Sequence, residues 1–479
     1  MEFNSLFFIL LFLPLFIGLM FFIKNNNVRN ILLPLFSIIF YCLGDIKHIH
    51  ILLIVFLITY LSALKVKNNR RLYVLYLILV VGILSYFKYG TYIIEAFKSY
   101  LKDLNFFKIV MPLGISFYTF TSISYVSDVF YEKYDAEKNP LKIFTFLSFF
   151  PVVISGPLIR CDSFKEYLKN KNISVDSIAN GFRRFIIGLS KKVIIANQLN
   201  IISTTVINGD TKISFLLAWY ALIAYGIQEF YDFSGYSDMA IGIGEMIGFV
   251  IPENFNDPYF SHSIAEYWRR WHMSLGKWFN DYVFMPVSTS AFLRKISKKF
   301  KNKKVGRSFI KIISLLAVWL LTGIWHGSSA NYVIWGLING LIIICDSNFS
   351  DFYRKILAKL KINSDGKLWK AFQIIRTMLI IFLMKSLIFK CTNIVEITNL
   401  TKGLLGIGER FSMSYIKSLD ILYLLFYLIL SFIFLFPAVH SLFKIINKNV
   451  YDILLLLLLV VSICFIVSGS YSAFIYFSF

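Results

Sequence analysis

Two of the six histidines stand in settings that suit proton transfer. His272 lies among tryptophans and arginines in WRRWHMSL, and His326 ends an almost uncharged run, flanked by Gly323 and Gly327. Imidazole is the side chain best suited to exchange a proton near neutral pH. A lone buried histidine is usually a packed core residue, but two in aromatic, glycine-lined settings favour catalysis. Interfacial or structural roles are expected for the other four, His48, His50, His262 and His440.

The segment that carries His272 is predicted to be one amphipathic helix. Residues 264–278 read IAEYWRRWHMSLGKW, with Glu266 and Arg270 at i,i+4 spacing. In such a helix His272 would share a face with Trp268 and Trp271. Around it, between about 226 and 290, ionisable residues alternate with aromatics, and ionisable residues at membrane depth usually face a cavity. A solvated loop is the alternative interpretation of this stretch.

The composition places these residues in a membrane protein. Of 479 residues, 57% are hydrophobic and 16% are charged, against roughly 25% charged in a typical soluble domain. So much apolar surface needs lipid as its solvent, which excludes a cytosolic enzyme, a disordered chain and a collagen-like chain. The five cysteines show no C-x-x-C spacing, so neither disulfides nor a metal site is expected, and no bound cofactor is expected.

Apolar runs along the chain predict an all-α polytopic membrane protein. The first, 3–23, lacks any charge and is read as a retained transmembrane helix. Further runs, including 141–158, 371–389 and 453–479, lead to an expectation of about 11 spanning helices. The shorter runs are expected to be re-entrant or half-membrane helices. No soluble domain is apparent, so residues 1–479 are expected to form a single transmembrane domain.

The net charge of +22 predicts an orientation rather than a nucleic-acid partner. Much of the excess lies in short loops, and cytoplasmic loops collect Lys and Arg, which anionic lipid headgroups attract. Nine basic residues and no acid lie between Arg294 and Lys311. This loop and the basic cluster at 65–71 are expected to be cytoplasmic, with the N-terminus outside.

Several motifs together resemble the membrane-bound O-acyltransferase family, in particular its bacterial branch that O-acetylates alginate. The motif-bearing core covers about 111–340. The matching segments are MPLGISFYTFTSISYVSDVF at 111–130, SFFPVVISGPLIR at 148–160, DFSGYSDMAIGIGEMIGF at 232–249, NFNDPYFSHSIAEYWRRWHMSLGKWFNDYVFMPV at 254–287 and TGIWHGSSANYVIWGLING at 322–340.

The resemblance implies a helical membrane domain with a central tunnel reached from both faces. It implies that His326 and His272 are the catalytic histidines, with Trp325 and Gly327 in supporting positions. The chain departs from the family pattern at Asn339, where this branch often has a histidine, at Asn197, where an aspartate is common, and at Thr121, where a glutamine is usual. None of these changes touches the two histidines.

The resemblance further implies a reaction, in which an acyl group passes from a cytoplasmic thioester to a hydroxyl presented from outside. His326 is expected to be the base, and the rings of both histidines are expected within roughly 10 Å of each other, as proton transfer around one small substrate would require. Acetyl-CoA is the expected donor, with Arg269, Arg270 and Lys277 as candidate ligands of its phosphates. Pairing with Glu266 or anchoring at lipid headgroups is the alternative for the arginines.

The resemblance also implies partners and a location. An extracytoplasmic polysaccharide is the expected acceptor, with a separate extracytoplasmic acetyltransferase completing delivery, at the inner (cytoplasmic) membrane. Two other functions remain open. One is a D-alanyl transferase that uses a carrier-protein thioester to modify teichoic acid. The other is a transporter or flippase, for which intramembrane charges would mark a substrate path.

Overall fold

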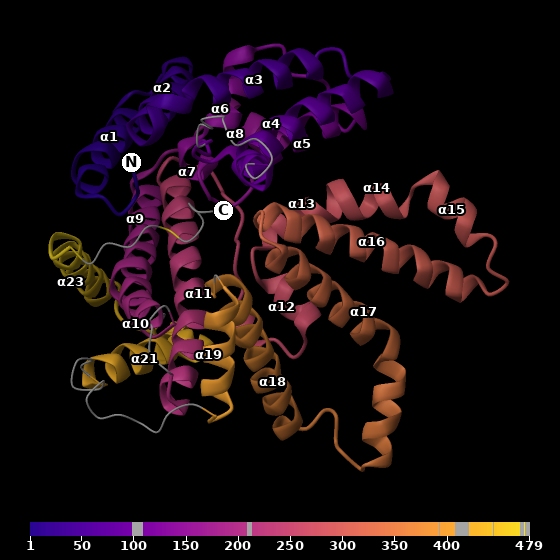
Figure 1. Cartoon of the computed structure of the whole chain (residues 1–479). Helices are drawn as coiled ribbons and strands as arrows, with labels where there is room; N and C mark the ends of the chain where they lie inside the picture. The colour runs from indigo at the N-terminus through magenta and orange to yellow at the C-terminus, as the bar shows by residue number, and fades with distance from the viewer. Residues whose placement is uncertain are drawn as a thin grey trace. The chain divides into compact units, whose positions relative to one another are not determined.

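The computed structural model describes residues 1–97, 109–207, 213–391, 393–407, 421–443, 445–469 and 474. Over these residues the fold is helical, and the one β-type feature is an isolated antiparallel bridge between Phe255 and Trp271. The predicted all-α class is confirmed. The chain divides into two compact units (Figure 1). The first comprises 1–189, 236–253 and 476–479, of which the last four residues lie outside the described part, and the second comprises 190–235 and 254–475.

The first unit is built around a helix that is buried on all sides. In α5 (Ile115–Phe130) every residue from Ile115 to Val129 is buried. One of its hydroxyls is held by two neighbours, since Ser122 Oγ lies 2.5 Å from both Thr59 Oγ1 and Tyr76 Oη. The other helices of this unit are α1 (Leu13–Phe22), α2 (Asn26–Asp45), α3 (Ile49–Ala63), α4 (Arg70–Phe97), α6 (Pro140–Ser148), α7 (Phe150–Val153), α8 (Cys161–Lys169) and α9 (Val175–Ser190).

The second unit carries both candidate histidines. Its α-helices are α10 (Asn197–Ile207), α11 (Phe215–Met246, which enters the first unit at Tyr236), α12 (Ile264–Arg270), α13 (Met273–Phe279), α14 (Met285–Ser288), α15 (Ala291–Ser297), α16 (Lys303–His326), α17 (Ala330–Lys359), α18 (Lys367–Lys385), α19 (Ile394–Leu404), α21 (Ile421–Leu435), α22 (Pro437–Phe443) and α23 (Lys448–Val467). Short π-helical or 3₁₀ turns lie between some of them, at Lys191–Ala196, Pro258–Phe260, Asn280–Phe284 and Ser386–Lys390.

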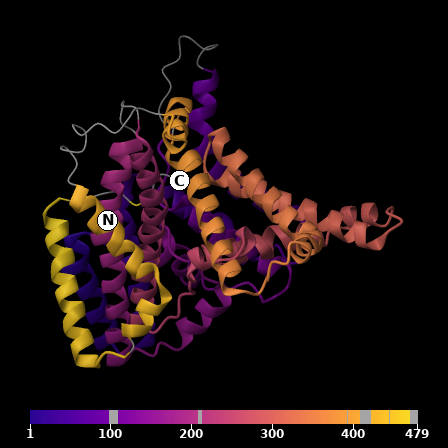
Figure 2. The same ribbon diagram turned by 90° about the horizontal axis from the view of Figure 1, so that it is seen from below.

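Helices α16 and α17 form an antiparallel hairpin, shown in orange tones in Figures 1 and 2. The side chain of Asn302 caps the start of α16 by accepting from the Lys304 N–H, and Ser329 caps α17 in the same way. The two helices approach closely at Gly323, where an added Cβ would lie 2.5 Å from the Tyr332 carbonyl oxygen. Small residues at such contacts are the usual device for close helix packing in membranes.

Six of the described helical stretches are long and apolar enough to cross a membrane, or seven if the bent pair α21–α22 is one span. The expected count of about 11 stays a prediction. The predicted span 3–23 is shorter than expected, because its helical part, the π-turn Phe8–Phe12 followed by α1, covers 15 residues. Pro14 at the start of α1 has no N–H to donate, which fits the widened turn before it. The predicted run 141–158 is broken into α6 and α7, and the end of 453–479 is largely outside the described residues.

Candidate functional site

His326 is the last residue of α16 and lies in an aromatic cage. Its side chain is buried, and its ring centroid lies 4.5 Å from that of Trp325, 5.1 Å from Trp335, 5.2 Å from Phe389 and 6.3 Å from Tyr332. The rings come from α16, α17 and the turn that follows α18. The cage keeps bulk water away from the imidazole, as proton transfer to a substrate requires.

The predicted supporting residues Trp325 and Gly327 border this cage. The indole of Trp325 is buried. At Gly327 an added Cβ would lie 2.5 Å from Cε2 of Tyr332, so glycine lets the Tyr332 ring cover the backbone next to His326. This close approach, rather than a special backbone conformation, accounts for a glycine at this position, since its φ of 172° is extended.

His272 is not inside a helix, which corrects the prediction of one continuous helix over 264–278. Helix α12 ends at Arg270, Trp271 is extended, and His272 adopts the left-handed conformation at φ 47° and ψ 51° before α13 begins. The break follows from pairing with another segment. Trp271 bridges Phe255, the Asn256 N–H donates to the Arg270 carbonyl, and the Met273 N–H donates to the Asn254 carbonyl. Left-handed conformations in non-glycine residues are costly and concentrate at functional sites.

Asn254 fixes the orientation and tautomer of His272. Its Oδ1 accepts from the Ser274 N–H at 3.2 Å and from the Ser274 hydroxyl at 2.9 Å, which identifies that atom as the oxygen. The same Oδ1 lies 3.0 Å from Nδ1 of His272, so Nδ1 must carry the proton. Burial lowers the pKa of His272 to about 3. The ring is therefore neutral near pH 7, with Nε2 as its basic nitrogen, and the ring of Phe233 stands edge-on to it at 4.6 Å.

A continuous chain of rings connects the two histidines. Trp268, from α12, lies 5.4 Å from Trp335, which contacts His326, and 5.0 Å from Tyr267, which stacks at 5.6 Å on Trp271 beside His272. Asn339 reinforces the link, because its Oδ1 accepts from Trp268 Nε1 at 2.9 Å and its Nδ2 donates to the Trp335 carbonyl at 2.9 Å. The departure from the family pattern at Asn339 is thus a buried tie between the two histidine-bearing segments.

Sequence reasoning missed a buried ion pair at the same place. Lys385, at the end of α18, lies 3.0 Å from the carboxylate of Glu229 in α11, and both side chains are almost fully buried. The Lys385 ammonium also lies 3.4 Å from the centroid of the Trp271 indole, a cation–π contact. The signal was present, since a lysine in the apolar run 371–389 is by default a functional candidate.

The short segment from Lys385 to Phe389 contacts residues at both histidines. Lys385 contacts Trp271, the neighbour of His272, and Phe389, four residues later, packs on His326. The two residues are joined by the π-helical turn Ser386–Lys390. The structure therefore brings His272 and His326 into one aromatic and ionic cluster of the second unit. Their predicted catalytic roles stay a prediction.

The candidate donor ligands are not buried in this cluster. Arg270 forms the expected ion pair with Glu266 at 2.6 Å, the alternative weighed for it from the sequence. Arg269 and Lys277 are exposed. No group of three or more His, Cys, Asp or Glu side chains with metal-binding geometry occurs among the described residues.

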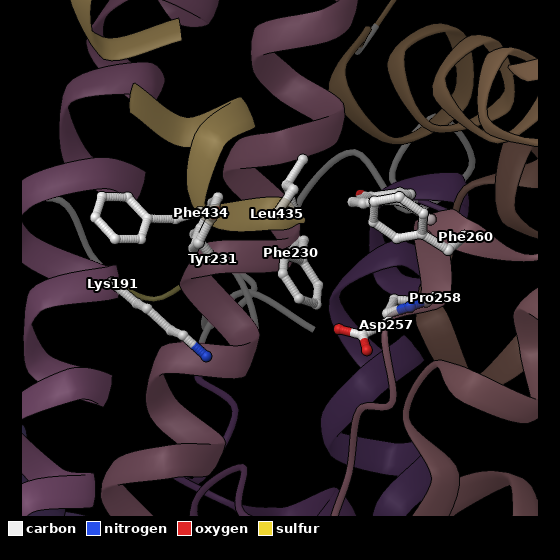
Figure 3. Close-up of a pocket in the computed structure, with 9 residues that line it drawn as sticks. Lys191, Phe230, Tyr231, Asp257, Pro258, Phe260, Phe434 and Leu435 are labelled. Atoms are coloured by element: carbon white, nitrogen blue, oxygen red, sulfur yellow. The ribbon is translucent and has the colours of Figure 1, made fainter. Parts of the chain in front are cut away.

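A small cavity adjoins the cluster (Figure 3). The lining residues are Phe230 and Tyr231 of α11, residues 257–260, Phe434 and Leu435 of α21, and Lys191. The amino group of Lys191 lies across the cavity from the Asp257 carboxylate. Its volume of about 20 Å³ is close to that of one water site, so it does not accommodate an acyl donor.

Several known proteins have sequences similar to this chain. A protein of Pseudomonas aeruginosa named "Probable alginate O-acetylase AlgI" is 33% identical over 359 residues, covering 71% of this chain and 65% of that protein, just under two thirds of its length. A peptidoglycan O-acetyltransferase of Helicobacter pylori is 29% identical over 396 residues, covering 74% and 72%. A teichoic acid D-alanyltransferase of Bacillus subtilis is 32% identical over 253 residues, covering 51% and 60%.

The family model of the membrane-bound O-acyltransferases matches residues 53–389, a range that contains both histidines, Glu229 and Lys385. Together with the helical fold and the apolar spans, this match identifies a multi-pass membrane protein. The chain belongs to the membrane-bound O-acyltransferase family.

Proposed function

We propose that this protein is an O-acetyltransferase, which moves an acetyl group from a cytoplasmic thioester to a hydroxyl on the other side of the inner (cytoplasmic) membrane. The observation that carries the proposal is the shared cluster of His272 and His326, two buried imidazoles linked by Trp268, Asn339 and Trp335. Relatives named as O-acetylating enzymes of alginate and of peptidoglycan support acetyl as the group transferred.

In the proposed reaction His326 is the general base. The acceptor hydroxyl oxygen attacks the thioester carbonyl carbon while its proton passes to the imidazole. The tetrahedral oxyanion then collapses, the C–S bond breaks, and the leaving thiolate takes the proton back. Of the predicted supports, Trp325 and the backbone N–H groups near Gly327 are candidates to hold the oxyanion. His272, whose ring is fixed by Asn254, orients the hydroxyl or the thioester.

The Glu229–Lys385 pair acts through Trp271. The buried ammonium holds the indole face, and the indole belongs to the strand-like segment that sets the left-handed turn at His272. Lys385 is therefore a positioning residue in this proposal.

Acetyl-CoA is the proposed donor, approached from the cytoplasm. Arg269 and Lys277 are exposed beside His272 and would meet donor phosphates, with Arg270 held by Glu266. The proposed acceptor is an extracytoplasmic polysaccharide, or a separate extracytoplasmic acetyltransferase that completes delivery to it. The second candidate function is D-alanyl transfer from a carrier-protein thioester, which the Bacillus subtilis relative favours.

The orientation is tested in the basic segment from Arg294 to Lys311, at the end of α15. A cysteine in place of Ser297, in a background without the native cysteines, should resist a membrane-impermeant maleimide in intact cells, because basic loops stay in the cytoplasm. It should react once the cells are permeabilised. Labelling of intact cells would place the donor on the wrong side and contradict the proposal.

The reaction is tested with purified protein in nanodiscs and radiolabelled acetyl-CoA. Loss of a general base costs about 10²–10⁴-fold, so His326→Ala should lower acetyl release by that factor. His50→Ala, which removes an exposed histidine of the first unit, is the matched control and should leave the rate unchanged. Full activity in His326→Ala would overturn the mechanism. Turnover of a D-alanyl carrier thioester but not of acetyl-CoA would select the second candidate.

A further inference from the structure

The first unit contains a separate cavity with polar groups in an apolar wall. Its volume is about 270 Å³, near the lower end of the size of ligand pockets. It lies where α2 ends and α5 begins. The lining residues are Gly44, Asp45, Val110, Met111, Pro112, Leu113, Gly114, Ile115, Ser116, Phe117 and Ile154. Most of them belong to the motif MPLGISF, which the proposed transfer reaction does not use.

Asp45 is the one ionisable side chain among the described residues that line this cavity. Its carboxylate is anchored from two sides, since Oδ2 accepts from the Leu113 N–H at 3.0 Å and Oδ1 lies 2.7 Å from Nδ1 of His48. A carboxylate can accept about four hydrogen bonds, so these contacts leave acceptor capacity. The contacts with His48 and the Leu113 N–H occupy part of the carboxylate, which disfavours a site built for a free cation.

Ser116 provides a second polar group. Its side chain is 3% exposed, and its hydroxyl has no hydrogen-bond partner within the part of the chain that the structure describes. A buried hydroxyl left unsatisfied costs free energy, which a ligand in the cavity would recover by hydrogen bonding to it. Leu113, Phe117 and Ile154 supply apolar surface next to these polar groups.

We propose that this cavity binds one ring of a neutral saccharide, whose hydroxyls bond to Asp45 and Ser116 and whose C–H faces rest on the apolar wall. Anionic ligands, including uronates and lipid phosphates, are disfavoured because the one charge lining the cavity is negative. The inference rests on the proposed function in one respect, since a neutral sugar would be a unit of the acceptor. Its test reads binding rather than acetyl transfer, so the two proposals can fail separately.

The test uses full-length protein in nanodiscs and saturation-transfer difference NMR with methyl β-cellobioside as the probe. Wild type should show saturation of the sugar protons, which Asp45→Asn and Ser116→Ala should each reduce at least fivefold. Asp135→Asn is the matched control, because Asp135 is an exposed carboxylate of the same unit, and it should keep the full signal. Thermal unfolding is measured on every variant and should match wild type in Ser116→Ala, and acetyl-CoA turnover is measured on wild type and on Asp135→Asn as a separate readout.

Two results would overturn the proposal. One is the lack of a sugar signal in wild type at millimolar probe, or an equal signal in wild type and both cavity variants. The other is an Asp45-dependent signal from a dianionic disaccharide of uronates, or from choline, that exceeds the signal from the neutral sugar. An empty cavity with normal acetyl-CoA turnover would leave the proposed function intact and remove the saccharide site.

Discussion

The two histidines of the second unit are both buried, but their surroundings differ in kind. His326 stands at a helix end inside a cage of four aromatic rings. His272 sits in a left-handed turn, and Asn254 fixes its tautomer by a directional hydrogen bond. Aromatic walls exclude water while leaving a ring some freedom, whereas a hydrogen bond to a known acceptor settles which nitrogen carries the proton. In the proposed mechanism, this difference supports proton transfer by His326 and orientation of the substrate by His272.

The largest effect is expected at the ion pair that supports the His272 side of the cluster. Lys385→Met leaves the buried carboxylate of Glu229 without its partner, and such changes cost about 3–5 kcal/mol. The variant should therefore unfold at a clearly lower temperature in detergent and lose acetyl-CoA turnover. The double variant Lys385→Met/Glu229→Gln, which removes both charges, should recover most of the stability but not the activity. If the Lys385 variant is as stable as wild type, the Glu229–Lys385 ion pair does not stabilise the fold.

A second prediction separates the hydrogen-bonded histidine from the caged one. Asn254→Ala removes the acceptor for His272 Nδ1–H and for two donors of Ser274, each unsatisfied group costing about 1–3 kcal/mol. The rate of acetyl-CoA turnover should fall about 10–100-fold, mainly in kcat. Asn254→Asp keeps an acceptor in place and should restore much of the rate. If Asn254→Ala changes stability but not kcat, the network only supports the fold.

The smallest effect is expected at the hydrogen bond from Trp268 to Asn339, which links the segment of His272 to helix α17 beside His326. Trp268→Phe keeps a ring in place but leaves the Asn339 carbonyl oxygen without its donor, at a cost of about 1–2 kcal/mol. The unfolding temperature should fall modestly, and the turnover rate should fall with it. Trp369→Phe, at a half-buried indole of α18 away from the cluster, is the matched control. If both variants change the unfolding temperature and the turnover rate equally, the Trp268–Asn339 hydrogen bond has no specific role.

The sequence predicted the ring-lined part of this cluster better than the hydrogen-bonded part. The helical class, the buried end of the run at His326 and the Glu266–Arg270 pair follow from local periodicity, and the structure confirms them. The break at Trp271 and His272 was not predicted, because residues 254–256 impose it and periodicity carries no information on such pairing. Tertiary contacts override helix propensity there.

Lys385 and Asn254 illustrate two further limits. Lys385 was visible as a lone charge in an apolar run. Its partner Glu229 lies more than 150 positions away, so the ion pair could be identified only from the folded structure. Asn254 gave no signal of its own, since an asparagine close to Asn256, Asp257 and Pro258 is typical of many loops. The single-domain expectation and the count of about 11 spans stay predictions, as do the catalytic roles.

The central claim is that His272 and His326 serve one reaction, and a double-mutant cycle tests it most directly. The quantity measured is the rate of acetyl-CoA turnover by wild type, His272→Ala, His326→Ala and the double variant in nanodiscs. Residues that act in one step are strongly non-additive. The account predicts that the double variant is no more than about threefold slower than the slower single variant. Losses that multiply, with the double variant slower by the full product of the two single effects, would contradict it.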